Sequence, residues 1–214
     1  IKENSVVIDA GANYGQLSIL FSKVKPNVHV YAFEAYKYIS EILQKNVLIN
    51  NSKVKVHNYI LSDESKKNLI ISESILKEFN NYGSNFVDLK KKSNQGNLVD
   101  SVKIDDLNIQ QEVSFMKIDV QGYDLKVLRG AEKTIKRNKM PIIIEYSKEF
   151  ESKFNYKFSD FLEYPDATDE SEIIVKKGKK LKTIPGKEKL LKITTEWDYM
   201  VLMKIMNEDK EYRT

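Results

Sequence analysis

The sequence of 214 residues has no cysteine and only two histidines, His29 and His57. The lack of cysteine excludes disulfides, thiolate catalysis and cysteine-ligated metals. Two histidines are too few for a metal site built from several imidazoles, so we expect no metal. No apolar run reaches the ~18 residues that span a bilayer, and no basic-then-apolar leader stands at the start. We therefore expect a cytoplasmic protein without a membrane span.

The composition is that of a globular protein, with 41% hydrophobic and 31% charged residues. The length fits one domain over residues 1–214. The formal net charge is +4, and most of the positive charge comes from lysines spread along the chain, with clusters at 90–92 and 176–182. No aromatic residues interleave these clusters, which favours a solvated lysine-rich surface over a nucleic-acid interface. We therefore expect no specific nucleic-acid partner, and the oligomeric state stays open.

Short β-branched runs alternate with segments of helical periodicity in the first half and again after residue 113. The first helix places Leu17, Leu20, Phe21 and Val24 on one face, which we expect to point inward. Repeated alternation predicts an α/β fold, with a mostly parallel sheet covered by helices on both faces. The predicted strands are 6–8, 28–33, 54–61, 114–120 and 141–146, and the predicted helices are 16–23, 36–50 and 123–137.

Two regions depart from this alternation. Residues 62–100 are polar and irregular apart from short strands at 69–72 and 99–104, and a long insertion of this kind is more often a functional lid than a linker. Residues 150–214 form a C-terminal part with a helix beginning at 158–162 and two closing strands at 172–177 and 197–206.

The loop after the first strand reads Asp9-Ala10-Gly11-Ala12-Asn13-Tyr14-Gly15. Glycine allows close approach of the backbone to a ligand. The spacing is not the G-x-G-x-x-G of dinucleotide sites, in which pyrophosphate sits on the helix N-terminus. An acid at this point disfavours phosphate but suits a cation. S-adenosylmethionine carries an ammonium and a sulfonium and no phosphate, so the loop favours this cofactor.

Two further polar positions follow the next strands. Glu34 ends the second strand, 19 residues after Gly15, where a carboxylate can accept both ribose hydroxyl hydrogens. The same feature serves NAD sites, so it indicates adenosine rather than one cofactor. Ser62 and Asp63 follow the third strand, where they either bond the adenine edge or form a simple turn.

A third polar cluster follows the fourth strand. Asp119 ends that strand, and Gly122 allows a sharp exit into a helix. A carboxylate here can face a methyl donor and an acceptor together. Lys117 lies on the same face of the strand as Asp119, and a lysine in a buried strand needs a partner. An ion pair is one solution, and a purely structural role remains open. Glu145 ends the fifth strand and also points to the mouth of the sheet.

Taken together, these segments resemble the FkbM-type methyltransferases, a branch of the Rossmann-like class I methyltransferases. The resemblance implies a seven-stranded sheet whose last two strands form an antiparallel hairpin, S-adenosylmethionine as cofactor, and O-methylation of a hydroxyl on a sugar, glycan or related small molecule. The matching segments occur in the family's order and are 7–15, 30–35, 61–63, 83–84, 102–107, 115–122, 127–131 and 143–145.

By the same resemblance, one set of residues would surround the cofactor. The motif positions are Asp9, Gly11, Asn13, Gly15, Glu34, Ser62 and Asp119, and their neighbours Ala12, Tyr14, Ala35, Asp63 and Gln121 complete the candidate set. A neutral hydroxyl must lose its proton during methyl transfer, so a nearby base helps. We favour Asp119 as this base and Glu145 as the second candidate. The loop at 80–85 would form part of an acceptor lid.

Two departures from the family pattern bear on activity. Position 121 is Gln where the family more often has Glu, and Tyr36 replaces a proline-containing turn. Gln121 cannot act as a carboxylate base, so a non-catalytic module that binds S-adenosylmethionine is one alternative. An RNA or protein methyltransferase on the same fold is another, although the fourth strand lacks an Asn-Pro-Pro-Tyr-like motif. An NAD-dependent enzyme is disfavoured by the loop spacing.

Overall fold

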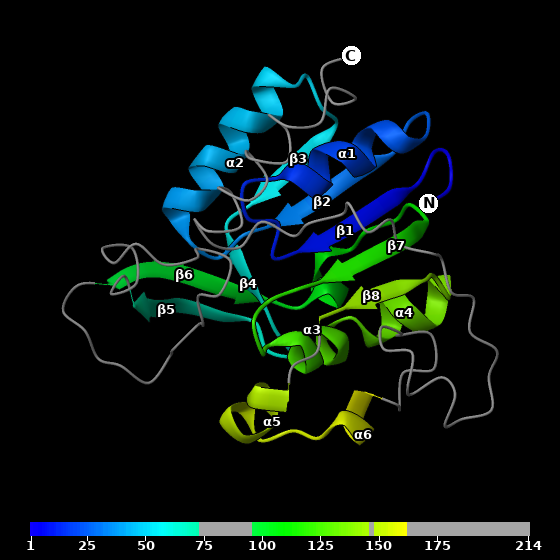
Figure 1. Ribbon diagram of the computed structural model, residues 1–214. Coiled ribbons are helices and arrows are strands. Elements are labelled where there is room, and N and C mark those ends of the chain that lie inside the picture. The colour runs from blue at the N-terminus through cyan, green and yellow to red at the C-terminus, as the bar shows by residue number, and fades with distance from the viewer. Residues whose placement is uncertain (73–95, 146–147, 162–214) are drawn as a thin grey trace, which may run out of the picture.

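The computed structural model describes residues 1–72, 96–145 and 148–161. Its central sheet has five parallel strands in the order β3-β2-β1-β7-β8 (Figure 1). This confirms the predicted parallel α/β sheet. Seven strands are not confirmed, because the predicted closing strands at 172–177 and 197–206 lie outside the described residues. The strands are β1 (Val6–Ala10), β2 (His29–Phe33), β3 (Val54–His57), β7 (Val113–Ile118) and β8 (Ile142–Ile144).

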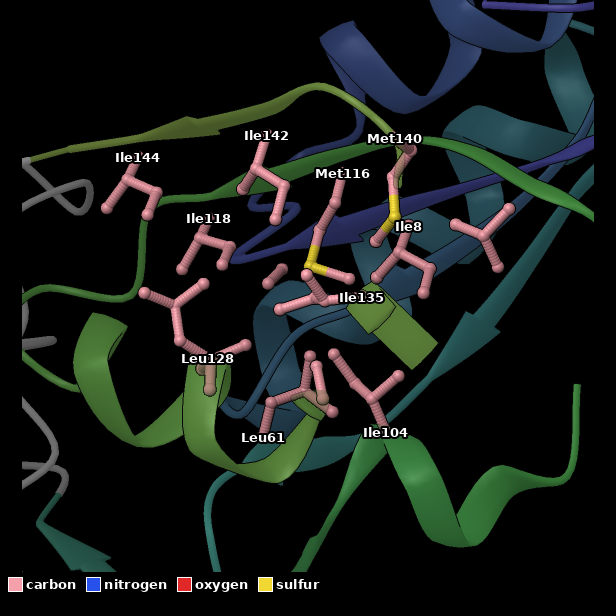
Figure 2. Close-up of a cluster of buried hydrophobic side chains, with 14 of the residues drawn as sticks. Ile8, Leu61, Ile104, Met116, Ile118, Leu128, Ile135, Met140, Ile142 and Ile144 are labelled. Carbon is pink, nitrogen blue, oxygen red and sulfur yellow. The ribbon is translucent and has the colours of Figure 1, made fainter. Parts of the chain in front are cut away.

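Helices cover both faces of this sheet, with α1 (Gln16–Val24) and α2 (Lys37–Ile49) on one side and α3 (Asp124–Gly130) and α4 (Glu132–Asn138) on the other (Figure 1). Side chains alternate along β1, since Ile8 packs against α3 and α4 while Val7 packs on the other face. Figure 2 shows the larger of these cores. It includes Ile8, Met116, Ile118, Leu128, Ile135 and Ile142.

The orientation of α1 differs from the sequence prediction. Leu17, Leu20 and Val24, which the sequence predicts to point inward, are 44%, 56% and 48% exposed. Phe21, the fourth residue of that face, packs against the core as predicted. The inner face instead carries Ser18 and Ser22, both buried. The Ser18 hydroxyl donates a hydrogen bond of 2.5 Å to Asp9 Oδ2. A buried carboxylate requires such a donor, and a helix that turns Ser18 toward Asp9 leaves Leu17, Leu20 and Val24 toward the outside.

The predicted third strand, 54–61, is two strands in different sheets. β3 ends at His57, and β4 (Tyr59–Leu61) joins a second sheet of order β4-β6-β5 with β5 (Lys66–Ser72) and β6 (Gly96–Val102). Asn58 stands between them, and its Nδ2 donates to the carbonyls of Glu34 and Ala35 at 2.8 Å each. These bonds fix the chain where the strand changes sheet. The ends of the predicted insertion thus form strands, while 73–95, including the predicted lid at 80–85, lie outside the described residues.

The predicted helix 123–137 is also interrupted. Ala131 has φ −114° and ψ 10°, so α3 ends at Gly130 and α4 begins at Glu132. The Asp105 carboxylate, in the short 3-10 helix η2 (Ile104–Leu107), accepts the N–H groups of Lys133 at 2.9 Å and Thr134 at 2.8 Å. First-turn N–H groups have no partner within their own helix, so Asp105 stabilises a new helix start.

Two short helices, α5 (Lys148–Phe154) and α6 (Phe158–Phe161), complete the described chain. The second of them confirms the helix predicted to begin at residue 158. Among the helices in the described ranges, none has the length and apolar character needed to cross a bilayer.

Candidate functional site

A pocket of about 250 Å³ lies at the carboxyl ends of β1, β2 and β7. From β1 the chain adds β2 and β3 on one side, and it later adds β7 and β8 on the other. Such a reversal of strand order opens a crevice where ligands bind in α/β sheets. The lining combines backbone of the 9–15 loop with carboxylates and with apolar and aromatic side chains, among them Leu17, Phe33, Tyr36, Ile39, Tyr59 and Tyr123.

The 9–15 loop approaches the end of β7 closely. Gly11 has φ +76°, and a Cβ there would lie 1.8 Å from the Asp119 carbonyl oxygen. The N–H groups of Gly11 and Ala12 both donate to the Phe33 carbonyl, at 3.0 and 2.9 Å. Only glycine fits this contact, and these bonds hold the loop against the end of β2. The Asn13 side-chain oxygen is buried and makes no hydrogen bond within the described residues.

Glu34 is buried at the pocket wall and is 8% exposed. Its Oε2 accepts the Asn13 N–H at 3.0 Å, and its Oε1 accepts the Tyr36 N–H at 2.9 Å. A proline at position 36 could not donate the second bond, whereas Tyr36 does. Each carboxylate oxygen can still accept a further hydrogen bond. Burial raises the pKa of Glu34, against the lowering effect of its backbone hydrogen bonds.

Lys117 contacts two carboxylates and one backbone carbonyl at the pocket. Its Nζ lies 3.4 Å from Asp9 Oδ1 and 3.3 Å from Asp119 Oδ2, and it donates to the Gly11 carbonyl at 2.8 Å. The side chains of Asp9 and Lys117 are only 1% and 11% exposed, whereas that of Asp119 is 39% exposed. The predicted ion pair of Lys117 is therefore confirmed, and it includes a second carboxylate.

Gln121 joins the two candidate bases. Its Nε2 donates to Asp119 Oδ1 at 3.1 Å and to Glu145 Oε2 at 2.6 Å. Burial works against ionisation of Asp119, but the charge of Lys117 and side-chain hydrogen bonds with Glu145 and Gln121 hold its pKa below the ordinary value. Asp119 is thus maintained as a carboxylate at the pocket surface.

The structure brings together most of the predicted site residues, although not all of them. The residues that line the pocket are Asp9, Gly11, Ala12, Asn13, Glu34, Ala35, Asp119 and Gln121. Glu145 lies behind this lining, through its bond to Gln121. Tyr14 and Gly15 lead into α1, and the Tyr14 carbonyl accepts a bond from Asn46.

Ser62 and Asp63 are not part of the pocket lining. The Ser62 hydroxyl donates to Asp63 Oδ1 at 3.1 Å, and the Ser62 carbonyl packs against Gly130. The preceding residues Ile60 and Leu61 reach the pocket instead. Sequence reasoning missed these apolar residues and the tyrosines of the lining, because nothing in their spacing separates them from ordinary core residues.

Asp124, at the start of α3, supports the turn that carries Gln121. Its Oδ1 and Oδ2 accept the N–H groups of Val120 at 3.2 Å and Gly122 at 2.9 Å. Burial raises the pKa of Asp124 to about 6, despite these hydrogen bonds. The folded protein therefore binds this proton more tightly than the unfolded chain does.

The raised pKa of Asp124 predicts a particular dependence of stability on pH. Its contribution is fully present below about pH 4 and is lost as the pH rises through about 6. The difference in unfolding free energy between native protein and Asp124→Asn should fall by about 3 kcal/mol over that interval, since one pKa unit corresponds to about 1.4 kcal/mol. Urea denaturation at several pH values checks this, and Asp63→Asn is the control. A difference independent of pH would contradict it.

A family model and solved structures are similar to this chain. The methyltransferase FkbM domain matches residues 9–170. The chain belongs to the FkbM methyltransferase family. One similar solved structure is methyltransferase FkbM from Methylobacillus flagellatus KT, at 19% identity and a TM-score of 0.53, over 78% of this chain and 39% of that one. A proposed rRNA methylase from Clostridium thermocellum shares 13% identity at a TM-score of 0.44, over 79% and 74% of the two chains.

The FkbM neighbour shows the shared fold, and the present chain spans less than half of that protein's length. No curated protein matches the sequence. Within residues 1–72, 96–145 and 148–161, no three His, Asp or Glu side chains are grouped as a metal site would require.

Proposed function

We propose that the protein is an S-adenosylmethionine-dependent methyltransferase that methylates a hydroxyl group of a sugar, glycan or related small molecule. The observation that carries the proposal is the charge of the pocket at the β1–β7 crevice. Among the described residues, three carboxylates, Asp9, Glu34 and Asp119, line it together with one lysine, Lys117. This excess of negative charge suits a nucleoside that bears cationic groups and disfavours the pyrophosphate of a dinucleotide.

The residues of the pocket fit such a cofactor. Glu34 has spare acceptor capacity for ribose hydroxyls. The buried, unpaired Asn13 oxygen is available to a donor on a ligand. Ile39, Tyr59 and Ile60 provide an apolar and aromatic wall for a flat base. Sites for small molecules combine a mostly apolar lining with a few such polar groups.

S-adenosylmethionine supplies an electrophilic methyl group when it is bound. The protein's part is to orient the acceptor hydroxyl opposite the departing sulfur, and positioning alone can lower a barrier by roughly 7–11 kcal/mol. Asp119 would accept the proton of the acceptor hydroxyl, since its half-exposed carboxylate stays ionised. Asp119→Asn should therefore reduce turnover while the affinity for the cofactor changes less.

Transfer of an isotopically labelled methyl group from S-adenosylmethionine to a panel of hydroxyl-bearing sugars and glycans tests the proposal. Incorporation that survives mild base, as an ether does and an ester does not, supports it. Labelling of amines or carboxylates alone would reject the hydroxyl assignment. Binding of the cofactor without transfer to any member, over a panel that includes RNA, would favour a non-catalytic binding module.

Glu34→Gln should weaken binding of S-adenosylhomocysteine at least tenfold, because a hydrogen bond to a charged acceptor contributes ~1.5–3 kcal/mol. The pKa of Glu34 is raised, so its carboxylate takes up a proton at a higher pH than an ordinary glutamate does. In the native protein the affinity should therefore begin to fall at that higher pH as the solution is acidified. Calorimetric titration over a pH series measures both effects. Glu41→Gln, on the exposed side of α2, is the matched control. Equal affinities for the two variants would remove Glu34 from the cofactor site.

A further inference from the structure

The amide of Gln121 occupies a position between two carboxylates. Its Nε2 carries two hydrogens, and the two acceptors are Asp119 Oδ1 and Glu145 Oε2. Lys117 lies against the other oxygen of Asp119 at 3.3 Å. One carboxylate is therefore held from both sides, and the second is tied to it both by a direct side-chain hydrogen bond and through the neutral amide of Gln121.

The backbone around Gln121 is shaped to aim this amide at the pocket. Gln121 has φ +52°, a region that non-glycine residues seldom adopt, and Gly122 follows at φ +95°. Asp124 accepts the N–H groups on either side of Gln121, and the Phe154 ring packs where a Cβ of Gly122 would lie, 2.1 Å away. A strained residue held by several contacts is a common feature of functional sites.

A glutamate at position 121 could not make the same contacts. An ionised carboxylate has no hydrogen to donate, so it would face two like charges and favour uptake of a proton. Glutamine provides the two donors and adds no charge. The departure from the family pattern at this position thus leaves two other carboxylates at the site, in a fixed arrangement.

We propose that Gln121 is a positioning residue that clamps Asp119 and Glu145 into one proton-accepting pair. This inference rests on the proposed hydroxyl methylation for the source of the proton. As the acceptor oxygen forms its bond to the methyl carbon, the carbon–sulfur bond breaks and its electron pair stays on sulfur. The electrons of the O–H bond remain on oxygen, and the proton passes to the Asp119–Glu145 pair.

The clamp can be tested without any acceptor or cofactor. Side-chain carboxyl resonances of Asp119 and Glu145 are followed by ¹³C NMR during pH titration of the native protein, Gln121→Met and Gln121→Glu. Gln121→Met keeps the length of the side chain but removes the donors, so the titration of the pair should move up by about one pH unit or more, a tenfold gain in proton affinity. Gln121→Glu should raise the last titration step further, because a third carboxyl joins the pair.

Gln44→Met, on the exposed side of α2, is the control and should leave the titration unchanged. A merely structural Gln121 would lower the melting temperature of its variants without moving the titration, and titrations of Gln121→Met and Gln121→Glu that superimpose on the native one would overturn the proposal. If Gln121→Met fails to fold, the Gln121→Glu titration decides alone.

The proposed function is judged separately by binding of S-adenosylhomocysteine to the native protein. Absence of binding would reject the cofactor, while the titration would still judge the clamp. Once an acceptor is found, the acid limb of the pH–rate profile should shift in Gln121→Met by the same amount as the titration. An unshifted limb would show that the pair does not take the proton.

Discussion

Lys117→Met is expected to lower the free energy of unfolding by about 3–5 kcal/mol, the range for removing one partner of a buried ion pair. Asp9 and Lys117 are almost fully buried, and the lysine lies 3.4 Å from Asp9 and 3.3 Å from Asp119. Without the lysine, Asp9 would keep the Ser18 hydroxyl as a hydrogen-bond donor but would lose its countercharge. Urea denaturation at neutral pH measures the effect.

Lys23→Met is the control for Lys117→Met, because Lys23 lies on the exposed side of α1 and should change stability by less than about 1 kcal/mol. The double variant Asp9→Asn/Lys117→Met should recover part of the loss, since it no longer buries an unpaired charge. A loss for Lys117→Met as small as that of the control would show that the lysine is not needed to hold Asp9 in the sheet.

Gly11→Ala is expected to destabilise the protein by at least about 3 kcal/mol, through a left-handed backbone and a steric clash together. The new Cβ would fall 1.8 Å from the Asp119 carbonyl, at φ +76°. Relief requires the 9–15 loop to move away from β7, which separates Asn13 from Asp119. Binding of S-adenosylhomocysteine should therefore be lost together with stability.

Asn51→Ala separates the two contributions to the Gly11→Ala effect. Asn51 has φ +46° but is exposed after the end of α2, so alanine there meets the backbone strain without the clash and should cost roughly 1–2 kcal/mol. Chemical denaturation and a thermal shift with ligand compare the two variants. A Gly11→Ala protein that matches Asn51→Ala in stability and still binds the ligand would contradict the close approach of loop and strand.

Much of the candidate site was predictable because its polar residues stand at the carboxyl ends of strands. Asp9 lies near the end of β1, and Glu34 and Asp119 come directly after β2 and β7; the ends of parallel strands meet at one edge of a sheet. Once the alternation predicts a parallel sheet, these three positions come together without knowledge of any contact.

Other features depend on contacts that sequence spacing does not encode. The apolar spacing of Leu17, Leu20 and Val24 defines one face of a helix but does not say whether that face lies inward. The bond from Ser18 to Asp9 decides the orientation of α1. Likewise, Asn58 interrupts a continuous strand pattern by donating to the carbonyls of Glu34 and Ala35, just after β2.

The role of Gln121 was hidden for a related reason. Its sequence position suggests a missing carboxylate, whereas its left-handed backbone directs the amide between Asp119 and Glu145. A departure from a family motif can therefore be read only with the geometry of its neighbours.

Calorimetric titration of the folded chain of residues 1–214 with S-adenosylhomocysteine, beside NAD at the same concentration, measures most directly whether the pocket at the carboxyl ends of β1, β2 and β7 binds the nucleoside of the methyl donor. We expect a saturable heat with one binding site for S-adenosylhomocysteine and no binding heat for NAD. Binding of NAD but not of S-adenosylhomocysteine, or binding of neither ligand, would contradict this expectation.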